Sequence, residues 1–252
     1  MDAFFSAGAM SGFVLLSLPH LLALVAVLLL ILGLYYARIT IRNHPWLRRT
    51  VRYGLAMLLL LSEASLNIWY LQQNLWDVRY TLPLELCSLT LLLSIIMLLT
   101  GSRWLYPFLF FAGIAGALQA LLTPNLLYGF PHFRYFQFFI SHAAIILASL
   151  YMTWIENYRL GWRSIVWAIL MLNISVAAIW GVDHAIGANY MFLAHKPHTA
   201  SLLDLLGPYP YYLLVEEGIA LLMFIILYVV FFLLPDKIAQ HNRIRKGARS
   251  SP

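Results

Sequence analysis

The chain has 252 residues, of which 62% are hydrophobic and only 10% are charged, and its formal net charge is +6. A soluble domain carries about 25% charged residues, so this composition excludes an ordinary soluble domain and predicts an integral membrane protein. The only cysteine, Cys87, excludes an internal disulfide and any CxxC metal or redox motif. The sequence also has no glycine-rich nucleotide-binding fingerprint.

Seven apolar stretches follow one another along the chain, and each is close to the roughly 20 residues that a membrane-spanning helix needs. We expect a single all-α domain over residues 1–252, with an outer loop at residues 181–210 and a basic tail at residues 235–252. The seven helices are expected at residues 17–37, 51–72, 82–100, 104–122, 135–157, 163–180 and 211–234.

The basic residues predict the orientation of this bundle. Of the 16 lysine and arginine residues, all but Arg79, Arg134 and Lys196 lie in the links after the first, third and fifth helices or in the tail. Because basic loops stay in the cytoplasm, the N-terminus is expected outside and the C-terminus in the cytoplasm. A positive charge confined to these links does not indicate a nucleic-acid partner.

Polar side chains gather in the outer half of the predicted bundle. At about 1.5 Å per residue, Cys87 lies roughly 8 Å and His142 roughly 10 Å below the outer ends of their helices. Other polar residues at similar depth are Glu63, Asn67, Gln119, Glu216 and Glu217. Because polar groups within a membrane face the bundle interior or water, this set predicts a polar cavity open toward the outer leaflet.

Cys87 and His142 suggest a nucleophile and its base. The imidazole would accept the thiol proton, since the thiolate is the nucleophile, and Glu216 or Glu217 could orient the imidazole. A structural interpretation stays open for each residue. A buried cysteine is most often a small hydrophobic side chain, an intramembrane histidine can join two helices, and adjacent glutamates can reach surface water.

The remaining polar features also allow two interpretations. Glu63 and Asn67 are an i, i+4 pair that is either structural or part of the site. Glu85 lies about 200° around the helix from Cys87, so the two side chains point nearly opposite ways unless the first turn is irregular. Residues 181–210 are either a lid over the cavity or a packed surface cap. No histidine pair has the spacing of a helical zinc site, so we expect no metal and no cofactor.

Several short blocks occur in a fixed order along most of the chain. They are Leu82-Pro83, Leu86-Cys87-Ser88-Leu89, residues 116–124, Phe138-Phe139, Ser141-His142, Asn189-Tyr190-Met191, Lys196-Pro197, residues 201–204 and residues 206–210. With these blocks the chain resembles the YwaF-type bacterial integral membrane proteins, which are similar to a eukaryotic multi-pass acyltransferase that remodels ether phospholipids. The resemblance implies that the active-centre cysteine and histidine of that enzyme correspond to Cys87 and His142. Glu85 departs from the pattern, because the bacterial proteins usually have histidine there.

The leading hypothesis is a phospholipid acyltransferase of the bacterial plasma membrane. Cys87 would take the acyl group as a thioester, with His142 as base and then acid. The oxyanion would be stabilised by Gln119, Asn189 or a backbone N–H at the start of the third helix. The alternatives are a non-catalytic receptor or transporter that binds a small polar or lipid ligand in the same cavity, and a scaffold whose outer loops bind another protein. The acyl donor, the acceptor and the oligomeric state stay open.

Overall fold

The computed structural model describes residues 2–9, 12–197 and 202–249, and the regular elements in these ranges are all helices. Five of the helices are long and apolar enough to cross a membrane. They are α2 (Leu18–Asn43), α3 (Pro45–Gln72), α7 (Phe133–Trp154), α8 (Arg163–Ile186) and a continuous helix made of α9 (Tyr211–Tyr228), the π-helical turn η4 (Val229–Leu233) and α10 (Leu234–Arg249). The chain is therefore an all-helical, multi-pass membrane protein.

Two shorter apolar helices occupy the positions of the other two predicted spans. One is α4 (Leu86–Thr100), and the other joins α5 (Tyr106–Phe108), the π-helical turn η1 (Leu109–Gly113) and α6 (Ile114–Leu122). With 15 residues, α4 is about 22 Å long, which is less than the roughly 30 Å of a hydrocarbon core. Three short elements complete the described chain: α1 (Asp2–Phe5), η2 (Tyr190–Phe192) and η3 (Leu202–Leu206).

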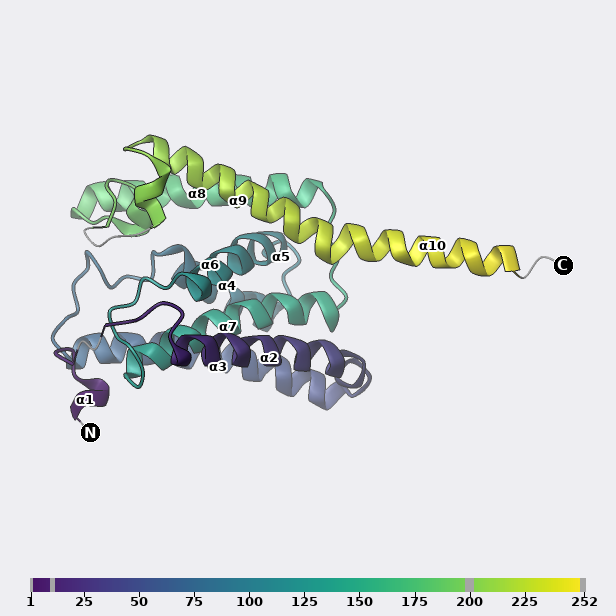
Figure 1. Cartoon of the computed structure of the whole chain (residues 1–252), viewed down its shortest axis with the longest axis horizontal. Helices are drawn as coiled ribbons and strands as arrows, with labels where there is room; N and C mark the ends of the chain where they lie inside the picture. The colour runs from purple at the N-terminus through teal and green to yellow at the C-terminus, as the bar shows by residue number, and fades with distance from the viewer. Residues whose placement is uncertain (1, 10–11, 198–201, 250–252) are drawn as a thin grey trace.

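The helices are arranged in layers, as Figure 1 shows. The α8–α9 pair forms one outer layer, α2 and α3 form the other, and α4 to α7 lie between them. The middle layer holds the core, because α7 is buried on nearly all sides and carries Ala143, Ala144 and Ala148 where its neighbours approach closely. By contrast, α2 and α8 expose most of their apolar side chains, as helices that face lipid do.

Several helix bounds differ from the expected ones. The predicted link after the first helix is reduced to His44, which ends α2 and precedes Pro45 at the first position of α3. Proline is favoured there because it lacks an N–H that would be unpaired anyway. The predicted helix at residues 82–100 begins only at Leu86, and the helix predicted at residues 135–157 runs from Phe133 to Trp154.

The last two predicted helices are longer than expected. The helix predicted at residues 163–180 continues to Ile186 and ends where Gly187 adopts a left-handed conformation with φ 67°. The expected loop at residues 181–210 therefore begins at Gly187 and contains η2 and η3. The expected basic tail is helical up to Arg249, because α10 continues α9 without a break.

The end of the bundle opposite the start of α4 is held by basic side chains and is called the basic end below. Arg48 forms an ion pair with Glu156, and the Tyr151 hydroxyl donates a 2.9 Å hydrogen bond to the same carboxylate. Arg42 and Arg52 donate to backbone carbonyl groups at the ends of α7 and α4. These contacts join α2, α3, α4 and α7 at that end.

Candidate functional site

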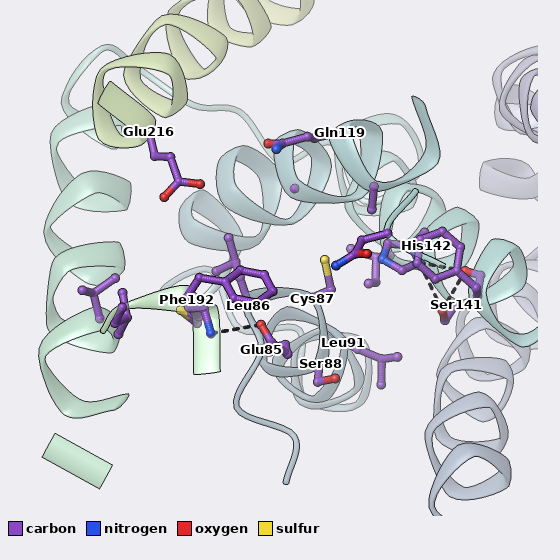
Figure 2. Close-up of a pocket in the computed structure, with 18 of the residues that line it drawn as sticks. Glu85, Leu86, Cys87, Ser88, Leu91, Gln119, Ser141, His142, Phe192 and Glu216 are labelled. Atoms are coloured by element: carbon purple, nitrogen blue, oxygen red, sulfur yellow. Dashed lines mark hydrogen bonds between the residues drawn. The ribbon is translucent and has the colours of Figure 1, made fainter. Parts of the chain in front are cut away.

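A cavity of about 700 Å³ lies between the α8–α9 pair and the core helices α3, α4, α6 and α7. Each of these helices contributes side chains to its wall. Figure 2 shows Cys87 near the centre of the cavity, with Gln119 and Glu216 to one side, Glu85 to the other and His142 across from Glu216. Most of the residues expected at a similar depth from the sequence therefore line the same cavity, although they come from five different helices or their ends.

On four helices that line the cavity, an apolar or small residue lies one turn nearer the basic end than a polar one: Leu91 below Cys87, Gly116 below Gln119, Ile145 below His142 and Ala220 below Glu216. Leu91, Gly116, Ile145 and Ala220 are called the apolar level below. The other charged or amide side chains of the wall include Glu63, Glu85, Arg134, Asn173 and Glu217, and apolar side chains such as Leu86, Phe138 and Leu213 lie among them. This division matches a lipid, whose polar part and acyl chain need different surroundings.

Two glycines of the η1–α6 stretch mark where the cavity stops. A Cβ atom on Gly116 would lie 3.6 Å from Leu86 Cδ2 and 3.9 Å from Cys87 Sγ, which is ordinary contact distance beside open space. A Cβ atom on Gly113, one turn further in, would lie 3.3 Å from Ile145 Cγ2, which is tighter than normal packing. The apolar level therefore closes between these two glycines.

Cys87 is the second residue of α4 and is half-buried. Glu85, the N-cap residue of α4, makes no side-chain hydrogen bond to the first turn. The first backbone hydrogen bond of the helix runs from the Leu89 N–H to the Glu85 carbonyl oxygen at 2.9 Å. The N–H groups of the first turn therefore have no partner within the helix. A helix N-terminus favours negative charge beside it, which suits a thiolate or an oxyanion at this point.

His142 is oriented by its own helix. Its Nδ1 lies 2.7 Å from the carbonyl oxygen of Phe138, and the ring packs 4.2 Å from the Phe138 ring. A carbonyl oxygen can only accept, so Nδ1 carries the hydrogen, and the Nε2 of the neutral imidazole keeps a free lone pair. The backbone of Phe138 thus takes the orienting role that the sequence assigned to Glu216 or Glu217.

The structure brings Cys87 and His142 to the wall of one cavity from α4 and α7. In the described chain, however, no hydrogen bond joins the thiol to the imidazole, whose partners are Phe138 and Ser141. Proton transfer between the two therefore needs a rotamer change or a bridging water or substrate atom.

The three glutamates on α3 and α9 line the cavity, and they differ in their partners. The Asn67 amide donates to the Glu63 carbonyl at 3.0 Å and to its carboxylate at 3.3 Å, while Asn67 itself stays outside the cavity. Asn67 is therefore a structural partner of Glu63. The Asn173 amide donates to Glu217 at 2.7 Å and joins α8 to α9, and Glu216 faces the cavity next to it.

Glu85 does not point away from Cys87, as regular helical geometry would require. It precedes α4 with an extended backbone, φ −64° and ψ 147°, so both side chains reach the cavity. Its carboxylate accepts a 3.1 Å hydrogen bond from the Met191 N–H. Asn189, expected as an oxyanion donor, does not line the cavity, because its amide binds the backbone of Ala194 and His195.

Residues 190–193 are named the cover turn here, and its Met191, Phe192 and Leu193 line the cavity beside Glu85. The Tyr190 hydroxyl donates to Val78 O at 2.8 Å and accepts from Leu82 N–H at 2.9 Å, while the Tyr190 N–H donates to Asp183 at 3.1 Å. Met191 and Phe192 both have φ 54°, a left-handed conformation that costs a non-glycine residue of order 1 kcal/mol or more. The turn is therefore strained and is held by contacts with other segments.

The sequence interpretation missed several residues of the cavity, of which Arg134 is the most informative. It was counted only as one of three basic residues on the predicted outer side. The sequence feature that could have identified Arg134 is its position within the aromatic run from Phe133 to Phe139, at the start of α7. Asn173 was missed because nothing in α8 distinguishes it. Within the described ranges, no group of three His, Cys, Asp or Glu residues could hold a metal ion.

Comparison with known proteins gives one match. No curated protein and no solved structure matches the chain. The model of the TMEM164 family matches residues 15–228, which run from just before α2 to the last residue of α9 and include every element that lines the cavity. The chain therefore belongs to the TMEM164 family.

Proposed function

We propose that the chain is a phospholipid acyltransferase of the bacterial plasma membrane, in which Cys87 is the nucleophile and His142 is the base. It spans the membrane seven times, with α4 and the α5–α6 stretch as two short spans, the N-terminus outside and the basic end in the cytoplasm. The cavity then opens toward the outer leaflet. The resemblance of the sequence blocks around Cys87 and His142 to those of the YwaF-type bacterial proteins supports this proposal.

One observation carries this proposal. The only cysteine of the chain and a histidine whose Nδ1 is already bonded line the same cavity, where polar residues border its apolar level. An ester group of a phospholipid belongs at such a boundary, with the headgroup on the polar side and the acyl chain on the apolar side. The reacting carbonyl would then lie beside the thiol.

The reaction follows from these positions. His142 Nε2 takes the thiol proton, and the Cys87 sulfur attacks the ester carbonyl to form a tetrahedral intermediate. The ester C–O bond breaks, the lysophospholipid oxygen receives the proton from His142, and the acyl group stays on Cys87 as a thioester. The hydroxyl of a second lysophospholipid then gives its proton to His142 and attacks the thioester, which forms a new ester and releases the thiol.

The oxyanion of each intermediate needs hydrogen-bond donors. The unpaired N–H groups of the first turn of α4 lie next to Cys87, and the Gln119 amide faces the cavity from α6. Fixed donors of this kind typically contribute about 3–4 kcal/mol to transition-state stabilisation. Asn189 is excluded from this role by its own contacts.

The test uses the full chain in phospholipid vesicles that carry a labelled acyl chain. We expect label on the protein that neutral hydroxylamine removes, because Cys87 is the only residue able to form a thioester. Cys87→Ala should carry no such label, whereas Thr100→Ala, at the far end of the same helix, should label like the wild type. Unchanged lipid turnover in Cys87→Ala would remove the proposal.

A non-catalytic ligand-binding protein is the second candidate, and one observation favours it. In the part of the chain that the structure describes, the Cys87 thiol and the His142 imidazole are not hydrogen-bonded to each other. This candidate predicts saturable lipid binding that is the same in Cys87→Ala and the wild type, together with no labelled thioester.

A further inference from the structure

Arg134 is the second residue of α7 and is the only basic side chain among the described residues that line the cavity. Its backbone N–H donates to the ring of His132 at 3.1 Å, which caps the helix. Its guanidinium donates to the Gln137 side chain, one turn further along α7, and both side chains line the cavity. Gln137 is five residues before His142, which corresponds to about 7 Å along the helix axis.

Aromatic rings hold the guanidinium in this position. Its central carbon lies 5.9 Å from the Trp69 ring centroid and 5.7 Å from the Tyr70 ring centroid, which is cation–π distance. Gln137 in turn contacts the Ser62 hydroxyl and carbonyl at 3.4 Å. A guanidinium has five N–H donors, so this arrangement fixes the group while leaving most of its donors available.

In the described ranges Arg134 forms no direct ion pair, and Glu63 acts on its guanidinium only electrostatically, from beyond 4.0 Å. Among the described residues, no carboxylate lies within 4.0 Å of Arg134, whereas Arg79 is paired with Asp77 and Arg48 with Glu156. Glu63 also lines the cavity, but its carboxylate binds the Asn67 amide. A half-buried charge that no carboxylate contacts directly is costly inside a membrane protein and usually has a ligand or a task.

The shape of the group indicates the ligand. The planar fork of arginine matches the paired oxygens of a phosphate. In a phospholipid the phosphate is separated from the reactive ester by the few bonds of the glycerol backbone, which is compatible with the short axial distance between Gln137 and His142. Glu216 lies across the cavity from His142 in Figure 2, so the carboxylates of α9 occupy the opposite wall.

We propose that Arg134 binds the phosphate of the lipid substrate and makes the site selective for phospholipids over phosphate-free lipids. This inference rests on the proposed acyltransferase function and adds the residue that reads the headgroup. Trp69, Tyr70 and Gln137 act on the phosphate only through Arg134, as positioning residues.

The experiment compares two donors with the same labelled acyl chains in vesicles, phosphatidylethanolamine and diacylglycerol. Arg134→Gln should lower kcat/KM for acyl loading of Cys87 from the phospholipid by about 10- to 100-fold, the usual effect of losing a charged hydrogen-bonded pair, and leave loading from diacylglycerol unchanged. Arg134→Lys should give a kcat/KM for the phospholipid between those of the wild type and Arg134→Gln, because lysine keeps the charge but lacks the planar fork. Arg79→Gln, which removes an exposed ion-paired arginine, is the matched control and should change neither donor.

The outcomes separate the two proposals. If the wild type loads no acyl group from either donor, the acyltransferase function fails, and the phosphate site is then judged by phosphatidylethanolamine binding to Cys87→Ala with and without Arg134→Gln. Equal loss for both donors in Arg134→Gln, or no loss for either, overturns the phosphate site. Binding of inorganic phosphate that depends on Arg134 while phosphatidylethanolamine binding does not would also overturn it, in favour of a free-anion site.

Discussion

The Nδ1 atom of His142 lies 2.7 Å from the carbonyl oxygen of Phe138, one turn earlier on the same helix. This bond fixes both the orientation of the ring and the position of its hydrogen, without any carboxylate. As the proposed base, His142 needs a fixed partner at Nδ1, so that Nε2 is the nitrogen that can accept a proton. The backbone of its own helix supplies that partner.

Replacing His142 by glutamine should lower the rate of Cys87 acylation by about 10²- to 10⁴-fold, since general-base catalysis typically contributes that factor. Glutamine is polar and close in size, so the helix should fold normally. The measurement is the initial rate of hydroxylamine-labile labelling. His184→Gln is the control, because His184 is exposed and stacks on Trp180 outside the cavity. Equal rates in the wild type and His142→Gln would exclude His142 as the base.

Two glycine substitutions should affect different properties, one the preference for acyl-chain length and the other the stability of the fold. Gly116→Leu fills the apolar level next to Cys87, where a Cβ is accommodated, so it should reduce loading of long acyl chains more than short ones. Gly113→Ala forces a Cβ to 3.3 Å from Ile145 and should destabilise the fold by about 1–3 kcal/mol without changing chain-length preference. Thermal unfolding in detergent and loading with chains of two lengths measure both effects. A shift in chain-length preference in Gly113→Ala, with none in Gly116→Leu, would contradict the conclusion that the cavity closes between these two glycines.

Replacing Tyr190 by phenylalanine should loosen the cover turn. The change leaves the Leu82 N–H and the Val78 carbonyl without their partner, which costs about 1–3 kcal/mol. Because Met191 and Phe192 are held in a strained conformation, the loss should appear first as faster amide hydrogen exchange at residues 190–193. Tyr209→Phe is the control, since Tyr209 is exposed. Unchanged exchange at the turn would mean that other contacts hold it.

The Arg48–Glu156 pair at the basic end should make stability depend on pH. Burial raises the pKa of the Glu156 carboxyl, but the hydrogen bonds from Arg48 and Tyr151 outweigh it, and the pKa lies below its ordinary value of 4.5. A carboxyl with a lowered pKa in the folded state stabilises the fold at neutral pH and loses this effect as pH falls below about 4.5.

Glu156→Gln should therefore lower the free energy of unfolding by about 1 kcal/mol at pH 7, a value discounted because Arg48 is partly exposed. The difference between variant and wild type should shrink as the pH is lowered toward 4. Melting temperatures in detergent measure it. Asp236→Asn, which removes the exposed Arg159–Asp236 pair, should have less effect at every pH.

Counting depth along straight helices placed several polar residues of the cavity wall at a similar level. Residues such as Glu63, Gln119 and Glu216 could be placed at one level because every helical residue rises by nearly the same amount. Of the seven residues assigned to that level, all except Asn67 line one cavity. Five of the seven expected spans are long helices, and the other two positions hold the shorter apolar helices α4 and α5–α6, whose ends hydropathy alone could not locate.

What depth could not predict depended on irregular backbone and on side-chain partners. Glu85 was placed opposite Cys87 because the helix was assumed to begin at Leu82, but four residues there are extended or turned. Asn189 looked like a donor, and its amide is satisfied within its own loop. Arg134 was overlooked because the aromatic residues that hold it come from α3, far away in the sequence.

The shortness of α4 has a chemical consequence. With α4 as one of the two proposed short spans, its length of about 22 Å would leave the chain before Leu86 within the thickness of the hydrocarbon region, where peptide groups cannot be left facing lipid. Val78 and Leu82 obtain a partner from Tyr190, and the remaining groups near Cys87 need water in the cavity. In the proposed reaction, water admitted to this place would compete with the lysophospholipid hydroxyl for the thioester. Slow release of free fatty acid should therefore accompany every transfer, and its rate should rise when the acceptor is withheld.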